Sequence, residues 1–551
     1  MQGNTARFFN KYGLVVGVYI IATLVTTAYR MKDTVEYAEA IQLAQFKDFG
    51  HFLWFPLGYF FFKILMPLAR LIEGFEPLKN IVLSLIIINW IAGLLSVIVM
   101  RRLADFVTKK AWPADFIVIG YCLSFGFLNH TQTGCSYVPG NLFMLLSLFL
   151  LIQQGFHHSH KFWPGIAAGL AMAVGVTMWA PYIFAVPGVL LAPLILYGHI
   201  KPWVSMASRS IVFFCILASL IYIFGAINQN IHSVTEAKAW IQEDAGGLAD
   251  RTGLPRVALG ISRTMLDIDN YNIILKRFRY HDPYNPVSLS GLFHFSLLKI
   301  FIVFIFCGIV LIHLMRTKEG RRILLVLSCY GIPILAFGFF WQGAEPERYQ
   351  ALVPIFFLSV GYLFGQKSIS AFFKFLVVLC VLFISISNLW LMAKPLRNPQ
   401  IEAEVKRIYA TNAIFNSESI FISIPKDNIF FIIRDYSIFH KSMYPYNGFF
   451  YPYNGIFSLS LNSGWKHALT RKILSVWERG GDVWISKRFL ISIPKFEWDW
   501  VEGEFPGLKW ADLYGFFSLF EYSKSIGNKD GFILLLRSSQ NARIIYQQKD
   551  I

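Results

Sequence analysis

The apolar residues of this chain are gathered into long blocks, most of them close to the roughly 20 residues that a helix needs to cross the ~30 Å hydrocarbon core of a bilayer. Because that core offers backbone groups no hydrogen-bond partners, helices are the expected structure. With 55% hydrophobic residues and a mean hydropathy of +0.50, the chain is not a water-soluble enzyme. Eleven blocks lie near residues 12–30, 80–100, 114–128, 138–153, 162–180, 182–198, 209–227, 291–315, 322–341, 349–365 and 371–392.

The charged side chains between these blocks are shared unevenly between the two sides of the membrane. If the amino terminus is cytoplasmic, the cytoplasmic loops hold fifteen Lys and Arg against three acidic residues. On the opposite side, residues 30–79 hold six basic and six acidic residues, and residues 228–290 hold seven of each. This is the positive-inside pattern. The net charge of +17 therefore reflects topology, and we expect no nucleic-acid partner.

The chain divides into two parts of different composition. Residues 1–393 are predicted to form a membrane domain with a first outer loop at 31–79 and a long outer loop at 228–290. After eleven crossings, residues 394–551 lie on the outer side as a soluble domain. Its patterns predict an α/β fold with a helix in KHALTRKILSVWERGG (466–481) and strands at 420–424, 429–434, 482–486 and 531–537. A repeat of YPYNG within 444–457 predicts an irregular aromatic loop or a stacking platform for sugar rings.

The second half of the first outer loop is apolar but interrupted. It contains Pro56, Lys63, Pro67 and Arg70, and a lipid-exposed span with two prolines and two cations is not expected. Helices lying in the membrane interface, with the basic side chains reaching the headgroups, suit it better. A true span here would also invert the charge asymmetry of every later loop.

A carboxylate follows the first apolar block without a linker. In KDTVEYAEAIQLAQ (32–45), a helix that begins near Asp33 places Glu36 and Tyr37 on one face with small and apolar residues. A carboxylate there is suited to act as a general base. Asp33 and Glu36 also have the spacing of a capping box, in which Asp33 only stabilises the helix, by about 1 kcal/mol. Asp33 is the candidate catalytic residue, and Glu36 and Tyr37 are candidates to position a substrate.

Several cations stand where outer loops meet spans. Arg348, in ERYQALVP, can hold a lipid phosphate through two hydrogen bonds, or can be an interface arginine paired with Glu345 or Glu347. In KRFRYHDPYNP (276–286) the cationic groups suit anionic headgroups, or can be ordinary interface anchors. The candidate phosphate-binding residues are Arg348, Lys276, Arg277 and Arg279, and the candidate substrate-positioning residues beside Glu36 and Tyr37 are His51, His281 and Tyr349.

Motifs for nucleotide or metal chemistry are lacking in the sequence. There is no glycine-rich phosphate loop, Cys/His metal spacing or nucleophile elbow. The HHSHK tract (157–161) has no carboxylate cluster beside it and is interpreted as a solvated loop. We assign no metal ligand and no certain cofactor, and leave a divalent metal open.

The order of these features resembles the GT-C superfamily of integral-membrane glycosyltransferases. The shared elements are one span, an acidic motif in the first outer loop (KDTVEYAEAIQLAQ), interfacial helices with a His and Pro segment (HFLWFPLG), further spans, an RY…P motif (ERYQALVP) and a soluble outer domain. The resemblance covers residues 1–393. Many such enzymes carry a second acidic residue in a later loop, and the sequence shows no matching residue, which leaves the metal requirement open.

The resemblance implies a fold with about eleven transmembrane helices, interfacial helices and a C-terminal soluble α/β domain. It implies transfer of a sugar from a polyprenyl-phosphate donor to a lipid, glycan or protein acceptor, with Asp33 as base and inversion at the anomeric carbon. Membrane lipids are further partners. The tail has no cysteine and therefore no disulfide, which favours the bacterial inner membrane over the endoplasmic reticulum. In that membrane the site and the tail would lie on the periplasmic side.

Three other classes remain. A glycan polymerase or ligase of the O-antigen type would use Arg and His of the outer loops in place of Asp33. A lipid or sugar transporter would place charged residues inside its spans. The predicted spans of this chain carry almost no charge, and Lys299 is the main exception. A non-catalytic scaffold would leave the acidic helix at 33–44 without a role.

Overall fold

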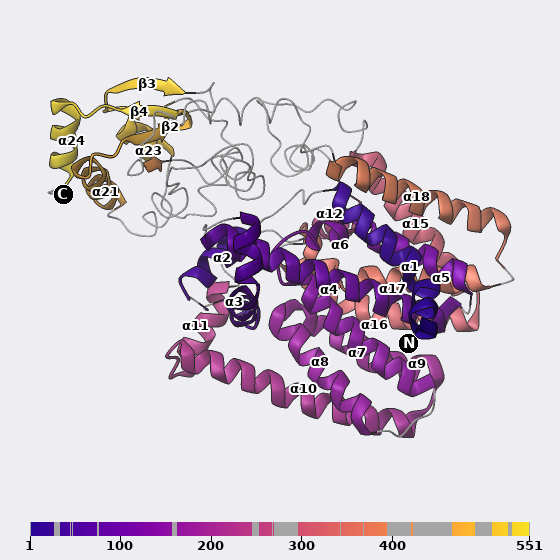
Figure 1. Cartoon of the computed structure of the whole chain (residues 1–551). Coiled ribbons are helices and arrows are strands. Elements are labelled where there is room, and N and C mark those ends of the chain that lie inside the picture. The colour runs from indigo at the N-terminus through magenta and orange to yellow at the C-terminus, as the bar shows by residue number, and fades with distance from the viewer. Residues whose placement is uncertain are drawn as a thin grey trace. The chain divides into compact units, whose positions relative to one another are not determined.

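The computed structural model describes residues 2–26, 33–44, 46, 48–73, 77–108, 110–156, 162–244, 253–266, 268, 296–341, 343–366, 369–393, 420–422, 465–490, 510–526 and 532–549. The chain forms two compact units (Figure 1). The first holds the described residues up to 393, and the second holds those from 420 onward.

Helices coincide with all eleven apolar blocks. Seven of the described helices are long and apolar enough to cross a membrane, and shorter apolar helices stand among them. This confirms a helical, polytopic membrane protein. The helices at the blocks are α1 (Gln2–Val25), α4 (Pro77–Thr108), α5 (Ala111–Cys122), α7 (Tyr137–Phe156), α8 (Phe162–Met178), α9 (Val186–Tyr197) after the 3-10 helix η1 (Ala180–Ala185), α10 (Ile200–Asn228), α15 (Ser296–Met315), α16 (Lys318–Phe340), α17 (Leu352–Gly365) and α18 (Ala371–Ala393).

The block predicted at 114–128 is two helices. After α5 ends at Cys122, a break follows and a short helix α6 (Phe125–His130) continues. At the break, the Leu123 carbonyl accepts a hydrogen bond from Asn388 Nδ2 at 2.8 Å, and Ser124 Oγ donates to the Tyr121 carbonyl at 2.6 Å. Backbone groups freed from the helix ladder are thus satisfied by side chains, as a low-dielectric interior requires.

The first outer loop forms two helices, α2 (Thr34–Gln42) and α3 (Trp54–Glu73). Helix α3 packs on α4 and exposes a helical stripe of Phe60, Ile64, Leu68 and Leu71. In Figure 1 it is seen nearly end-on, whereas α10 and α18 run across the page. This orientation fits a helix lying in the membrane plane, and the interfacial position itself stays a prediction.

Small residues bring the helices of the first unit close together. Helix α8 crosses α10 so closely that a Cβ on Gly169 would lie 2.3 Å from the Ser210 carbonyl oxygen. Ser210 Oγ donates to the Gly165 carbonyl at 2.8 Å, and Ser147 Oγ of α7 donates to the Ala168 carbonyl at 2.9 Å. Close backbone approach with hydrogen-bonding hydroxyls is typical of helix packing in membranes.

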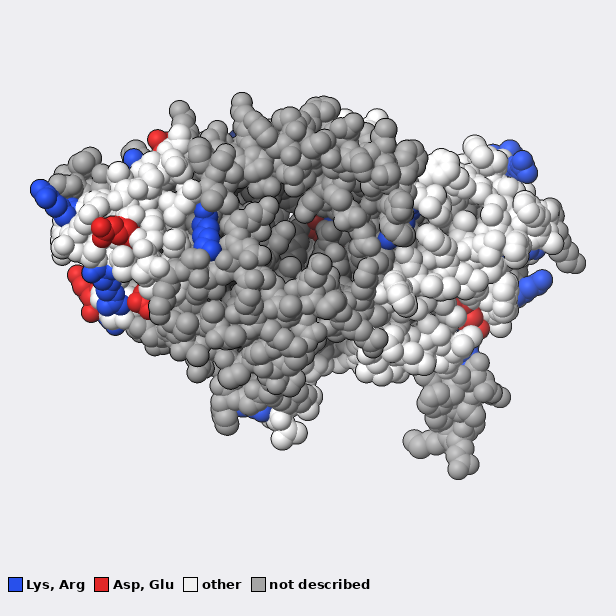
Figure 2. Space-filling view, turned by 90° about the horizontal axis from the view of Figure 1, so that it is seen from above, with Lys and Arg blue, Asp and Glu red and all other residues white. Residues whose placement is uncertain are grey.

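Charged residues of this unit join helices near one end of the bundle. Arg101 of α4 is 3% exposed and lies between Asp105 and Asp115, and Lys11 Nζ of α1 lies 2.8 Å from Asp105 Oδ2. These residues belong to the side predicted to be cytoplasmic. In Figure 2 the described surface of this unit, on the right, is mostly uncharged, with Lys and Arg at its far end.

The long outer loop contains two helices that the sequence analysis did not predict, α11 (Val234–Asp244) and α12 (Leu254–Met265). Trp240 of α11 meets Phe49 edge-on at 5.2 Å and Phe52 at 5.8 Å between ring centroids. Gln229 Nε2, just after α10, donates to the Phe46 carbonyl at 2.7 Å. The long loop is therefore fastened to the first outer loop.

The second unit is an α/β fold around a four-stranded sheet of order β1-β2-β4-β3. β1 (Ile420–Ile422) runs parallel to β2 (Val483–Ser486), and β4 (Phe532–Leu535) is antiparallel to β2 and β3 (Tyr522–Ile526). Helices α21 (Trp465–Glu478), α23 (Trp510–Phe517) and α24 (Ser539–Lys549) and the 3-10 helix η5 (Lys487–Phe489) complete the described part.

The helix and three of the strands predicted for the tail are confirmed. Helix α21 ends as expected, because Gly480 has φ +82° and the Gly481 N–H donates to the Val476 carbonyl at 2.8 Å. The polar strand β3 was not predicted. The strand predicted at 429–434 and the repeat at 444–457 lie outside the described residues.

Replacing Gly169 with alanine tests the packing of α8 on α10. The added methyl group meets a backbone carbonyl, so the helices must separate, and we expect a loss of about 1–3 kcal/mol in stability. Thermal unfolding of the purified protein in detergent would show a lower Tm than the wild type. Gly13→Ala is the matched control, since a Cβ there has no atom within 4 Å; equal Tm values for the two variants would contradict the packing described.

Candidate active site

Asp33 lies immediately before α2 and is fastened at two points. Its backbone carbonyl accepts the Tyr37 N–H at 2.9 Å, so it occupies the N-cap position that the capping-box spacing predicts. Its carboxylate oxygen Oδ2 accepts a hydrogen bond from the Tyr137 hydroxyl at 2.6 Å. Next to it, Thr34 Oγ1 accepts the Gly134 N–H at 3.0 Å. The first turn of α2 is thus held against the loop before α7, and the carboxylate is directed at Tyr137.

His51 and Tyr37 lie in the same cluster. The His51 side chain is 6% exposed, and its Nδ1 is 2.6 Å from Ser136 Oγ. Its ring stacks on Trp179 with centroids 4.5 Å apart, and the Tyr37 ring lies 5.1 Å from it. Backbone hydrogen bonds fix this arrangement: the Leu53 N–H donates to the Thr177 carbonyl at the end of α8, and the Gly50 carbonyl accepts the Ala180 N–H at the start of η1.

Arg348 belongs to a 3-10 helix, η3 (Pro346–Tyr349), just before α17. Its side chain is 7% exposed, and its Cζ lies 4.6 Å from the ring centroid of Trp179 and 4.3 Å from that of Trp341. A guanidinium stacked on indole faces gains cation–π energy and keeps its N–H groups in its own plane, where they can bind an oxyanion.

Two aromatic rings connect Arg348 with Asp33. Tyr137 donates to Asp33 and meets Trp179 edge-on with ring centroids 4.8 Å apart, and Trp179 in turn contacts the guanidinium. The structure therefore brings together the predicted base and the predicted phosphate-binding residue, which are 315 positions apart in the sequence.

The segment that carries Arg348 is supported by α12. Arg263 Nη1 of this helix donates to the Ala344 carbonyl at 2.7 Å, and Thr264 Oγ1 donates to the Pro346 carbonyl at 2.9 Å. The Tyr349 hydroxyl donates to the Gly343 carbonyl at 2.8 Å. Tyr349 thereby connects η3 to the turn before it, and its proposed contact with substrate stays a prediction.

Burial raises the pKa of two groups near Asp33. The pKa of the Tyr37 hydroxyl is well above its ordinary value, first because the side chain is buried and then because of the charges of Asp33 and Asp48. Burial also raises the pKa of the Cys135 thiol, with smaller additions from the charges of Asp33 and Glu347. Both groups therefore stay neutral at physiological pH. The charge of Asp33 acts on both of them, so Tyr37 and Cys135 share one electrostatic environment.

The sequence presents Glu347 only as a possible ion-pair partner of Arg348. It is 2% exposed, and its charge acts on Cys135 together with that of Asp33. It is therefore a candidate for the second acidic residue that the sequence alone did not reveal. The available signal in the sequence was an acidic residue directly before the predicted phosphate-binding arginine.

Further members of the cluster were missed: His130 lies in the segment 129–141, Gln350 lies just before α17, and Tyr182 lies in η1. The His130 ring lies edge-on to Tyr137 at 5.0 Å, and Gln350 Nε2 lies 2.7 Å from His130 Nδ1. The Tyr182 hydroxyl donates to the Tyr137 carbonyl at 2.7 Å. Isolated polar and aromatic residues in a short loop gave no pattern that could single them out.

The remaining predicted residues lie outside the description. These are Lys276, Arg277, Arg279 and His281, and the side chain of Glu36. Among the described residues, no group of three His, Cys, Asp or Glu side chains could hold a metal ion.

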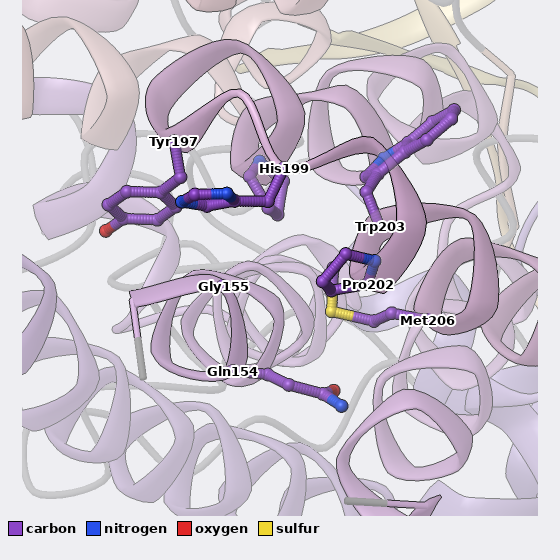
Figure 3. A pocket seen from close by; sticks show the side chains of 8 residues that line it. Gln154, Gly155, Tyr197, His199, Pro202, Trp203 and Met206 are labelled. Atoms are coloured by element: carbon purple, nitrogen blue, oxygen red, sulfur yellow. The ribbon is translucent and has the colours of Figure 1, made fainter. Parts of the chain in front are cut away.

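A small pocket lies at the opposite end of α7. Gln154 and Gly155 of α7 line it together with residues at the junction of α9 and α10, including Tyr197 and Trp203 at opposite sides of it (Figure 3). Tyr137 and Gln154 are about 26 Å apart along the helix, at 1.5 Å per residue. The pocket is thus separate from the cluster around Asp33.

Comparison with known proteins identifies the fold. No protein-family model and no curated protein matches the sequence. The crystal structure of ArnT from Cupriavidus metallidurans bound to undecaprenyl phosphate is 10% identical, with a TM-score of 0.52 over 97% of this chain and 99% of that one.

An oligosaccharyltransferase from Archaeoglobus fulgidus is also similar. Its apo structure is 14% identical, with a TM-score of 0.46 over 96% of this chain and 75% of that one. With its helices at every predicted block and its likeness to ArnT over nearly the whole length of both, the chain is a polytopic membrane protein with the GT-C fold.

Proposed function

We propose that this protein is a membrane glycosyltransferase that moves a sugar from a polyprenyl-phosphate donor to an acceptor hydroxyl. The observation that carries the proposal is the cluster Asp33–Tyr137–Trp179–Arg348, which joins a carboxylate base to a buried guanidinium through two ring contacts. The fold shared with ArnT, whose crystal structure contains undecaprenyl phosphate, supports this donor class.

The proposed chemistry is a direct displacement. Asp33 takes the proton of the acceptor hydroxyl as its oxygen forms a bond with the anomeric carbon. The bond between that carbon and the phosphate oxygen breaks, and the phosphate leaves with the electron pair and is held by Arg348. One displacement with one base inverts the configuration at the anomeric carbon.

The arrangement of Asp33 suits this role. The Tyr137 hydroxyl holds Oδ2 of the Asp33 carboxylate. This hydrogen bond sets the orientation of the carboxylate plane, and so the direction in which Oδ1 can meet an acceptor hydroxyl. A general base must be held within about 2.6–3.2 Å of the proton that it removes. Tyr137 is therefore a positioning residue for Asp33.

We place the reaction on the outer side of the membrane, in the bacterial periplasm, with the isoprenoid tail of the donor along α3. The charge asymmetry of the loops and the exposed apolar stripe of α3 support this placement. A polymerase or ligase that relies on the cations at 276–281, or a transporter, would leave transfer independent of Asp33.

Asp33→Asn tests the base. The carboxamide keeps the size of the side chain and cannot take a proton, so we expect transfer to fall at least about a hundredfold with donor binding retained. Transfer from radiolabelled polyprenyl-phosphate sugars is measured in reconstituted membranes. Asp48→Asn is the control, since the new amide oxygen can still accept the His51 N–H that Asp48 Oδ1 accepts at 3.0 Å. Persisting activity in Asp33→Asn would make Asp33 a helix cap only.

Tyr137→Phe tests the positioning of Asp33. Loss of a hydrogen bond to a charged group costs about 1.5–3 kcal/mol, so we expect kcat to fall about tenfold or more with little change in the donor KM. Tyr182→Phe is the control, because it removes a neighbouring buried hydroxyl that binds the Tyr137 carbonyl and not Asp33. Equal kcat losses in both variants would point to general disturbance of the cluster.

Arg348→Lys tests the phosphate contact. Lysine keeps the charge but loses the planar stack between indole rings and the paired N–H donors. We expect the donor KM to rise about tenfold, a change of about 1.4 kcal/mol. Arg101→Lys alters another buried arginine, which lies between Asp105 and Asp115 and not in the cluster, and should lower Tm without this effect. An unchanged donor KM in Arg348→Lys would argue against the phosphate role.

A further inference from the structure

Two tryptophans of the cluster carry buried donors without acceptors. The indole N–H groups of Trp179 and Trp341 have no hydrogen-bond partner among the residues that the structure describes. Leaving a buried donor unsatisfied costs about 1–3 kcal/mol, and native proteins rarely do so without a reason. Two other indoles of this unit have acceptors: Trp54 donates to the Gly134 carbonyl at 2.9 Å, and Trp203 donates to the Leu190 carbonyl at 2.7 Å.

Both tryptophans contact the same guanidinium. Trp179 follows the end of α8, Trp341 follows the end of α16, and Arg348 lies on η3. Three separate segments therefore place two unsatisfied indole N–H groups around one buried cation, at 4.6 Å and 4.3 Å from its Cζ to the ring centroids. Phe337 adds a third ring at 5.8 Å and itself packs on Trp341.

The hydrogen-bonding character of this set defines its ligand. An indole nitrogen and a guanidinium can only donate. A sugar hydroxyl both donates and accepts, so a site made only of donors satisfies it in part. A phosphate ester offers several oxygens that only accept, and hydrogen bonds to an ionised acceptor are about twice as strong as neutral ones.

We propose that the indole N–H groups of Trp179 and Trp341 bind the phosphate of the lipid-linked donor together with Arg348. The proposal rests on the proposed function and adds two specific ligands to it. The indoles contribute no charge, so they strengthen anion binding without repelling Arg348. In the free protein their N–H groups are unsatisfied, and this cost is recovered when phosphate binds.

Trp179→Phe and Trp341→Phe test the proposal, since phenylalanine keeps an aromatic face for Arg348 and removes the N–H. Equilibrium binding of labelled undecaprenyl phosphate is measured in nanodiscs, beside uncharged undecaprenol. We expect each variant to raise the Kd for undecaprenyl phosphate about tenfold and to leave that for undecaprenol unchanged. Trp203→Phe is the control, because it removes an indole N–H that already has an acceptor in the distant end of the bundle.

The outcomes separate the possibilities. Equal losses for undecaprenyl phosphate and undecaprenol would mean lost packing and would overturn the proposal. Unchanged binding in the Trp variants, with weaker binding in Arg348→Lys, would overturn it and leave the proposed function intact. If the wild type binds undecaprenyl phosphate no better than undecaprenol, both the tryptophan proposal and the proposed function fail. Inorganic phosphate is the remaining probe, and a Trp-dependent affinity for it alone would assign the anion site to free phosphate and overturn the lipid-linked source.

A variant that does not fold can be replaced by a closer analogue. Incorporating 3-benzothienylalanine at position 179 or 341 exchanges the N–H for sulfur and keeps the bicyclic shape. The expected change in Kd is the same as for the phenylalanine variants, and an unchanged Kd for undecaprenyl phosphate contradicts the proposal.

Discussion

The hydrocarbon core of a membrane supplies no hydrogen bonds, and this constraint governs how the first unit is built. Polar groups inside it must find partners within the protein. Ser210 and Ser147 bind carbonyls of neighbouring helices, and Asn388 binds the carbonyls of Leu123 and Met265 where helices end. The serine bonds fix helix crossings and the Asn388 bonds fix the ends of α5 and α12; the candidate site also lies at helix ends.

The site itself is assembled from segments that lie just beyond spans. Asp33 precedes α2, Tyr137 opens α7, Trp179 follows α8, and Arg348 precedes α17. Each spanning helix is a rigid support, so side chains at its end are held at a fixed height. Short contacts between these ends then create a cluster in which the Arg348 guanidinium is shielded from water, where its electrostatic effect is stronger than in solution.

The burial of Arg348 and the partial burial of Asp33 also have a cost that the cluster must offset. Arg348 is stacked on Trp179 and Trp341, and the Asp33 carboxylate accepts the Tyr137 hydroxyl. Tyr37 and Cys135 stay neutral, because their pKa values are raised first by burial. Charge in the described cluster is thereby concentrated on Asp33, Glu347 and Arg348, the groups that chemistry on a phosphate-linked sugar would need.

The sequence by itself determined the helices, since a span must be a continuous apolar block and the blocks are visible without any contact information. It also singled out Asp33 and Arg348, because a charge at the end of an apolar block is conspicuous. It did not predict the break after Cys122, the helix α12, or the roles of Tyr137, Trp179 and Glu347. Those depend on which helix ends meet, and contacts such as Asp33 with Tyr137, 104 positions apart, are encoded in packing and not in any local pattern. Only the tertiary structure decided that the base and the cation share one cluster, because the segments must meet closely: a Cβ on Gly134, for example, would lie 2.7 Å from the Thr34 methyl carbon.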